Sequence, residues 1–113
     1  MEFYYHDTDK DVLILHADGG LSANTARRFV SELETLVEAG CRKLIVDCSR
    51  LHRLTSYGVG ILVTLHLKMS GAGGEVKLAS VPSRVVKLLL MAQLDSVLQI
   101  YRDMDEARAA FDA

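Results

Sequence analysis

The chain has 113 residues, of which 50% are hydrophobic and 25% are charged, and this composition predicts a single folded domain over residues 1–113. A domain of this size buries enough surface to fold without metal ions or disulfides. The formal net charge is -2 and the basic residues are spread along the chain, which argues against a nucleic-acid-binding protein.

The N-terminal segment is predicted to form a β-hairpin. Residues 2–6 and 12–17 are strand-like runs on either side of a polar stretch, a pattern typical of two antiparallel neighbours. Gly19 and Gly20 follow the second run, and we expect them to end it in a tight turn.

An amphipathic helix and a buried strand are predicted next. Ser22 is a suitable N-cap and Gly40 is a typical C-terminal stop, and the apolar residues between them recur at helical spacing. The continuous apolar run 44–46 then indicates a strand buried on both faces of a parallel sheet. We expect a short polar loop between this strand and the next helix.

A second helix is predicted over about residues 57–70. Apolar side chains surround much of its circumference, so we expect one side to be buried and the other to be a contact surface. Gly71, Gly73 and Gly74 follow it. Because phosphate-binding glycines lie between a strand and a helix, we interpret these three as the end of a helix.

The remainder of the chain predicts two further pairs of a strand and a helix. Apolar and charged residues alternate over 75–78, and Pro82 is placed to open a helix. Residues 97–101 are strand-like, and residues 104–111 have the spacing of an amphipathic helix. Strands that alternate with helices imply an α/β fold, with a mostly parallel central sheet of about five strands and four helices.

The chain carries no sign of export. Cys41 and Cys48 flank a predicted strand that separates their α-carbons by roughly 20 Å, which is too far for a disulfide, and we interpret both as core or boundary thiols. The apolar stretch 59–67 is about half the length that spans a bilayer, and residues 1–10 lack the pattern of a signal peptide. We therefore expect a cytoplasmic protein without direct membrane insertion.

No residue pattern predicts an enzyme. A phosphate receiver needs several carboxylates around magnesium at the strand ends, and Asp47 with Asp18 does not supply them. Gly19 and Gly20 lack the lysine of a P-loop. The histidines are scattered over different predicted elements: His6, His16, His52 and His66. We predict no catalytic residue, no metal site and no cofactor.

The most specific pattern lies in residues 44–65, LIVDCSRLHRLTSYGVGILVTL. A buried strand and a polar loop lead to an apolar helix that opens with residues 55–58, Thr-Ser-Tyr-Gly. This segment resembles the central motif of STAS domains, named for sulfate transporters and anti-sigma factor antagonists, in which an Asp-Ser-Ser-Gly-like tetrapeptide opens a helix. The resemblance extends to the Gly-x-Leu-Asp-like segment 19–22, the Gly-Gly and strand of 73–78, and the Val-x-x-Leu-Leu helix within 81–94.

The resemblance implies a single STAS-like domain that acts by partner switching and not as an enzyme. In such proteins an anti-sigma factor serine/threonine kinase phosphorylates the serine that matches Ser56, and only the unphosphorylated antagonist binds the kinase and frees its sigma factor. Ser56 is the candidate phosphorylation site, with Thr55 as an alternative acceptor. The candidate partner-binding residues are Ser22, Arg53, Thr55, Ser56, Tyr57, Gly58 and Val59.

Other interpretations stay open. Serine and threonine favour N-caps, which contribute about 1 kcal/mol, so Thr55 or Ser56 could serve only to start the helix. Thr55 and Ser22 stand where the family pattern has aspartates, and Tyr57 replaces a small residue. The main alternative is a STAS scaffold subunit of a lipid-transport or stress-sensing assembly, without phosphorylation; a small enzyme or nucleotide-binding module is a third.

Overall fold

The computed structural model describes residues 2–7, 12–21, 23–54 and 56–112, with the side chains of most of them. The chain begins with the expected antiparallel hairpin, formed by β1 (Glu2–Asp7) and β2 (Leu13–Leu21). The elements that follow are, in chain order, α1 (Ala23–Glu38), β3 (Lys43–Leu54), α2 (Ser56–Gly71), β4 (Glu75–Ala79), α3 (Ser83–Met91), the short 3-10 helix η1 (Leu94–Ser96), β5 (Gln99–Tyr101) and α4 (Met104–Asp112).

The strands form one sheet in the order β1-β2-β3-β4-β5. Only the β1–β2 pair is antiparallel, and the three pairs from β2 to β5 are parallel. Parallel strands are joined here through helices, as the alternating pattern requires. The predicted fold class, a mostly parallel sheet with four helices and an opening hairpin, is confirmed.

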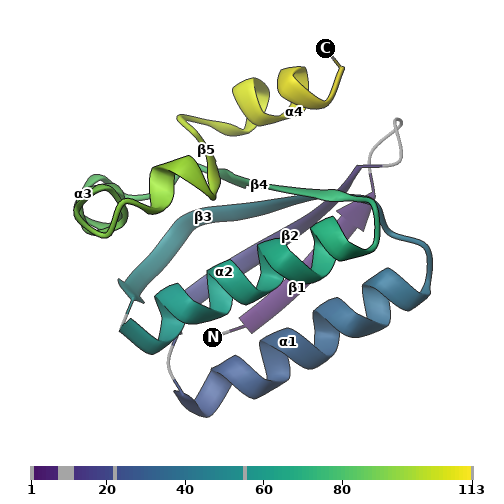
Figure 1. The fold of residues 1–113 in the computed structure, drawn as a ribbon, viewed down its shortest axis with the longest axis horizontal. Coiled ribbons are helices and arrows are strands. Elements are labelled where there is room, and N and C mark those ends of the chain that lie inside the picture. The colour runs from purple at the N-terminus through teal and green to yellow at the C-terminus, as the bar shows by residue number, and fades with distance from the viewer. Residues whose placement is uncertain (1, 8–11, 22, 55, 113) are drawn as a thin grey trace.

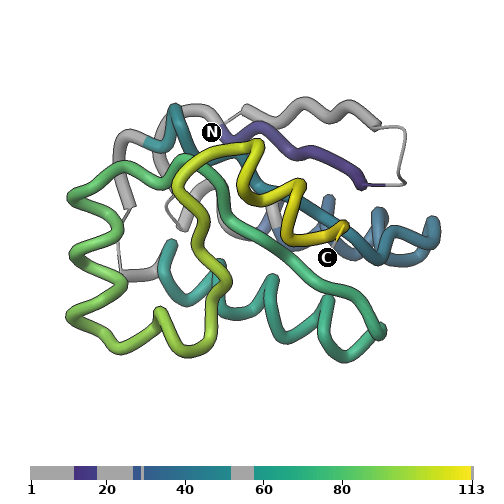
Figure 2. The backbone as a smooth tube through the Cα atoms, turned by 90° about the horizontal axis from the view of Figure 1, so that it is seen from above, coloured from purple at the N-terminus to yellow at the C-terminus, as the bar shows by residue number. Residues whose placement is uncertain are grey.

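Two apolar clusters form the core, and Figure 1 shows that α1 and α2 lie on one side of the sheet and α4 on the other. On one face, α1 and α2 lie side by side and bury Leu33, Leu65 and Met69 against the strands. We call this the α1/α2 face. On the other, the α4 face, Ala107 packs on Ile14, Ile45 and Ala79 from three neighbouring strands, and this cluster is the smaller. Figure 2 shows α4 lying across the sheet.

The predicted tight turn at Gly19 and Gly20 is wrong. Both glycines belong to β2, where they pair with Leu51 and Arg53 of β3. The register shifts between them and again between His16 and Asp18, and such shifts bend a strand without ending it. The glycines therefore prolong the β2–β3 pair past the last residue of β4.

The prediction that a polar loop begins soon after residues 44–46 is also wrong, because most of that segment is strand. β3 runs on to Leu54, although its pairing with β4 stops at Asp47. Asp47 thus lies within β3, not at its end. Beyond Asp47 the strand pairs with β2 but not with β4, and its polar residues Ser49 and Arg50 are exposed.

Lys77 departs from the alternation that predicts β4. The strand itself is confirmed, yet Lys77 is buried at 3% exposure. Its Nζ donates a hydrogen bond to the side-chain oxygen of Gln99 and another, of 3.4 Å, to Tyr101. The ring centroid of Phe111 in α4 lies 4.6 Å from the same Nζ. A buried ammonium is accommodated here by hydrogen bonds and aromatic faces.

Candidate functional site

Ser56 is the first residue of α2, and the long strand β3 ends at Leu54, two residues earlier. The prediction that this serine opens a helix is therefore confirmed at the level of the backbone. Ser22 and Thr55 lie outside the described residues, as do the side chains of Arg53, Ser56 and Tyr57. The exposure of the Ser56 hydroxyl stays a prediction.

The register of β2 and β3 brings the ends of these two strands, including Arg53, to one edge of the sheet. Gly20 pairs with Arg53 and Leu21 pairs with Leu54, so the two parallel strands end side by side. Because α1 begins at Ala23 and α2 begins at Ser56, both helices start from this edge. Segments that are more than thirty residues apart in the sequence are thereby brought together.

The first turn of α2 is anchored to the core. Gly58 is buried, and Val59 is half-buried against the cluster of the α1/α2 face. Further along, Leu62, Leu65 and Met69 are buried on the same side of the helix. The anchoring holds the start of the helix in place, while partner binding by Gly58 and Val59 stays a prediction.

The electrostatics at the start of α2 suit an anion. Its first turn contains no acidic residue, and a helix N-terminus carries about half a positive charge from its aligned peptide dipoles. In general, the first backbone N–H groups of an α-helix have no carbonyl partner inside the helix, and anions or capping side chains bind there. A phosphate on the first residue would therefore be compatible with the folded helix.

A polar pair that the sequence did not predict lies on the α4 face. His16 of β2 and Asp47 of β3 are cross-strand neighbours, and His16 Nδ1 lies 2.7 Å from Asp47 Oδ2, with both side chains 18% exposed. The backbone N–H of Ser49 donates to Asp47 Oδ1 at 3.0 Å. Burial opposes ionisation of Asp47, but the hydrogen bonds from Ser49 and His16 outweigh it and hold the pKa of this carboxyl below its usual value.

Asp47 is thus engaged in hydrogen bonds that join β2 to β3 and fix its own strand. Among the described residues, no three His, Cys, Asp or Glu side chains could share a metal ion. Sequence reasoning treated His16 as isolated. In the sequence, His16 and Asp47 each follow the apolar part of a strand, which hints that they occupy similar positions. That they are neighbours depends on the register between β2 and β3, which the sequence does not show.

The two cysteines match their interpretation as core and boundary thiols. Cys48 is fully buried and Cys41 is half-buried, and neither of these two described residues forms a disulfide. Burial, with a smaller effect of the Asp47 charge, raises the pKa of the Cys48 thiol to about 12. A thiol of such high pKa is a poor nucleophile.

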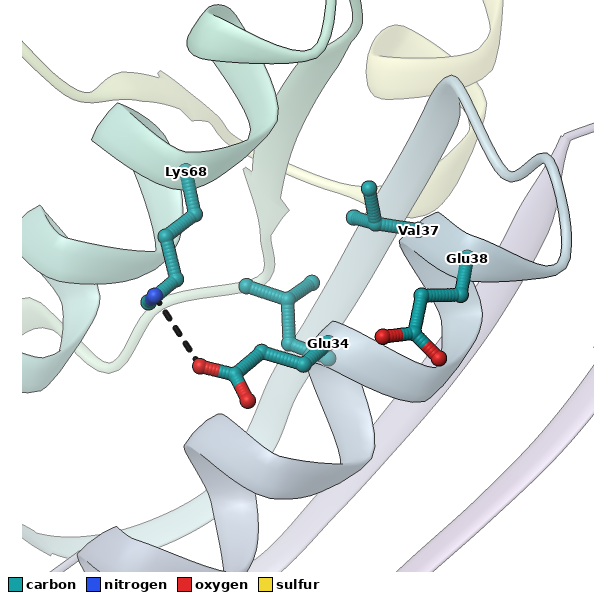
Figure 3. Close-up of a pocket in the computed structure, with 5 residues that line it drawn as sticks. Glu34, Val37, Glu38 and Lys68 are labelled. Atoms are coloured by element: carbon teal, nitrogen blue, oxygen red, sulfur yellow. Dashed lines mark ion pairs between the residues drawn. The ribbon is translucent and has the colours of Figure 1, made fainter.

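A shallow hollow of about 270 Å³ lies between α1 and α2 (Figure 3). Leu33 and Val37 line it together with Glu34, Glu38 and Lys68. Lys68 Nζ forms an ion pair of 3.0 Å with Glu34 Oε1 across the hollow. These residues belong to the later turns of both helices, away from Ser56, and the sequence predicted no site here.

Comparison with known sequences finds similarity to STAS domains and to anti-sigma factor antagonists. The family model for the STAS domain matches residues 6–107. A Thermotoga neapolitana protein assigned as an anti-sigma factor antagonist is 27% identical over 99 residues, which cover 87% of this chain and 88% of the relative. No helix within the described part of the chain has the length and apolar character needed to cross a membrane.

Solved structures extend the likeness to the fold. The crystal structure of a protein assigned as an anti-sigma factor antagonist from Thermotoga maritima has a TM-score of 0.90 and 26% identity, and the match covers 98% of this chain and 95% of the other. The anti-sigma factor antagonist SpoIIAA, a Bacillus cell fate determinant, is 16% identical. Its unphosphorylated and phosphorylated forms have TM-scores of 0.73 and 0.70 and match 98% of this chain, and 96% and 97% of their own.

Proposed function

This chain belongs to the STAS domain family, and we propose that it acts as an anti-sigma factor antagonist by partner switching. The unphosphorylated protein binds an anti-sigma factor serine/threonine kinase in the cytoplasm and thereby frees a sigma factor. Phosphorylation of Ser56 ends this binding. The residues that contact the kinase surround the start of α2: Ser22, Arg53, Thr55, Ser56, Tyr57, Gly58 and Val59.

The observation that carries the proposal is the position of Ser56 as the first residue of α2, at the edge where β2 and β3 end. A phosphate there adds about -1.5 to -2 charge and three acceptor oxygens. The positive end of the helix dipole favours this charge by about 0.3–1 kcal/mol. The modification can therefore change the docking surface while the domain stays folded.

The likeness to SpoIIAA supports the idea that a phosphate can change the docking surface while the fold stays the same. That protein has been solved in both phosphorylated and unphosphorylated forms. Both forms have the fold of the present chain, with TM-scores that differ only between 0.73 and 0.70. A phosphate is thus compatible with this architecture in a related domain.

The proposal is tested by incubating the protein with its cognate kinase and ATP and measuring intact mass. We expect the wild type to gain one phosphate, and Ser56→Ala to gain none. Thr55→Ala is the matched control and should still be modified. Phosphate on Ser56→Ala but not on Thr55→Ala would move the site to Thr55, and an unmodified wild type would contradict phosphoregulation.

Binding of the same variants tests the switch itself. Ser56→Asp should bind the kinase at least about tenfold more weakly than wild type, a loss of about 1.4 kcal/mol, whereas Ser56→Ala should bind about as well as wild type. Equal affinity for Ser56→Asp would contradict a mechanism based on charge. A stable partner that co-purifies regardless of Ser56 would favour the scaffold alternative.

A further inference from the structure

Exposed apolar side chains gather around α3. Within the described residues, five large hydrophobic side chains are exposed, and four of them lie in the segment 88–97. The four and their exposed fractions are Met91 with 83%, Leu90 with 50%, Leu88 with 40% and Val97 with 37%. The fifth, Leu67, lies in α2. Four exposed apolar side chains within ten residues of the chain make this segment a candidate contact surface.

The geometry of α3 explains why these side chains face outward. Only Val85 and Leu89 of this helix are fully buried, and their spacing of four residues puts them on one side. At about 100° per residue, Lys87 and Met91 point to the opposite side. The helix is therefore apolar on two sides, and only one of them serves the core.

Positive charge accompanies the outward apolar side. Arg84 and Lys87 are exposed, and Arg84 precedes Leu88 by four residues, as Lys87 precedes Met91, so each pair shares a face. The segment SRVVKLLLM has no acidic residue, and the exposed Asp95 of η1 is the one acidic residue between it and Val97, while the whole chain has a net charge of -2. A complementary partner would combine an apolar recess with carboxylates at its rim.

The position of α3 connects this surface to the proposed switch. Figures 1 and 2 both draw α3 at the end of the molecule where α2 begins. Val85 and Leu89 of α3 belong to the same core cluster as Val59 of the first turns of α2. Because α3 and the start of α2 lie at the same end of the molecule, a protein docked over Ser56 would be on the side from which α3 is also reached.

We propose that Arg84, Lys87, Leu88, Leu90, Met91 and Val97, here called the α3 surface, form a second docking site for the kinase that recognises Ser56. The inference rests on the proposed function and adds a division of roles. The α3 surface supplies apolar contact area that phosphorylation does not alter, whereas Ser56 carries the charge that changes. The occupant is a protein face with an apolar recess and an acidic rim.

The test compares Met91→Asp with Leu67→Asp in kinase binding. Both replace an exposed leucine or methionine of a helix by the same charged residue, but Leu67 lies about 16 Å along α2 from Ser56. We expect Met91→Asp to weaken kinase binding by about tenfold or more, as for a central apolar contact, and Leu67→Asp to stay within about twofold. Because Met91 is 83% exposed, the fold should persist, which circular dichroism checks.

A charge variant tests the acidic rim. Lys87→Glu should weaken binding several-fold at low salt, and this loss should shrink as salt rises because exposed charges are screened. In the phosphorylation assay, Met91→Asp should require a higher protein concentration for the same rate, while Ser56 stays the modified residue. A loss of phosphorylation that excess protein does not restore would count against a docking role.

The outcomes separate this inference from the proposed function. If Ser56→Asp weakens kinase binding and Met91→Asp leaves it unchanged, the docking role of the α3 surface is overturned and the proposed function is not. A wild type that neither binds the kinase nor is phosphorylated would overturn both. Light scattering that shows a dimer lost in Met91→Asp, without an effect on kinase binding, would identify a second copy as the occupant. The wild type could also sediment with phosphatidylserine vesicles. If Met91→Asp abolishes this sedimentation and leaves kinase binding intact, the α3 surface binds a membrane and the inference is overturned.

Discussion

At the scale of single residues, the His16–Asp47 pair is a polar contact that links β2 to β3 on the α4 face. Its two side chains are 18% exposed, and Asp47 receives hydrogen bonds from both His16 and Ser49. A carboxylate in such a place resists protonation because the ionised form accepts these bonds better. The pair therefore stabilises the fold most where Asp47 is ionised.

We expect Asp47→Asn to lower the free energy of unfolding by about 1–2 kcal/mol at about pH 7. Folding lowers the pKa of Asp47, so the native state binds fewer protons than the unfolded chain at acidic pH. The stabilisation is present above the unfolded pKa of about 4 and is lost as pH falls through the lower folded value. Urea titrations over this range should show the difference between wild type and variant shrinking with acidification.

Asp95→Asn, at an exposed position in η1, is the matched control and should change stability by no more than about 0.5 kcal/mol. The free energies of unfolding of Asp47→Asn and wild type should not differ by a constant amount down to about pH 2. A constant difference would contradict ionisation of Asp47 as the source of the effect.

At the scale of elements, the turn between α2 and β4 depends on a close backbone contact. Gly73 has a φ of 83°, a left-handed conformation that ends helices and favours glycine. The N–H of Glu75 then donates to the carbonyl oxygen of Arg42 at 2.9 Å, which starts the pairing of β4 with β3. Gly74 lies against Arg42 in this contact, and a Cβ there would be 2.5 Å from that oxygen.

Gly74→Ala should therefore destabilise the protein by about 1–3 kcal/mol, the usual cost of overpacking. The obstacle is backbone, which cannot move aside as a side chain would. Gly60→Ala is the matched control, because Gly60 is exposed within α2 and a Cβ there meets nothing within 4 Å. It should stabilise by up to about 1 kcal/mol through helix propensity. Chemical denaturation measures the free energy of unfolding of both variants. An equal change in Gly74→Ala and Gly60→Ala would contradict the close contact at Gly74.

At the scale of the whole molecule, the two faces of the sheet differ in how firmly they are covered. The α1/α2 face holds the larger cluster, which includes the fully buried Leu65. The α4 face holds the smaller cluster, in which Phe111 is only half-buried and packs near the Lys77 ammonium. Regions with few buried apolar contacts open at lower free energy than the core.

Phe111→Ala should loosen α4 selectively. We expect hydrogen exchange of residues 104–112 to accelerate by about tenfold or more, equivalent to about 1.4 kcal/mol of local stability, with exchange in α2 nearly unchanged. Leu65→Ala should instead lower the global free energy of unfolding by about 2–5 kcal/mol and accelerate exchange in both helices. Uniform acceleration in Phe111→Ala would mean that α4 does not open separately.

Local patterns were sufficient to predict the five strands and four α-helices in their order, but not η1 or the full lengths of β2 and β3. The glycine at position 40, with a φ of 99°, and the helix start at Ser56 were predicted because helix ends depend on residues within one turn. The interpretation of Ser56 as a phosphorylation site came from the resemblance to a family, since the same residue type also suits a simple N-cap.

The sequence by itself determined the alternation of strands and helices, the single domain and the chain position at which α2 begins, because hydrophobic spacing and helix-ending residues act over a few neighbours. Only the tertiary structure decided the length of β3, the His16–Asp47 pair and the burial of Lys77. Each of these depends on the register between strands or on the helix that covers a sheet face. Such contacts join residues far apart in the sequence, which periodicity within one segment does not encode.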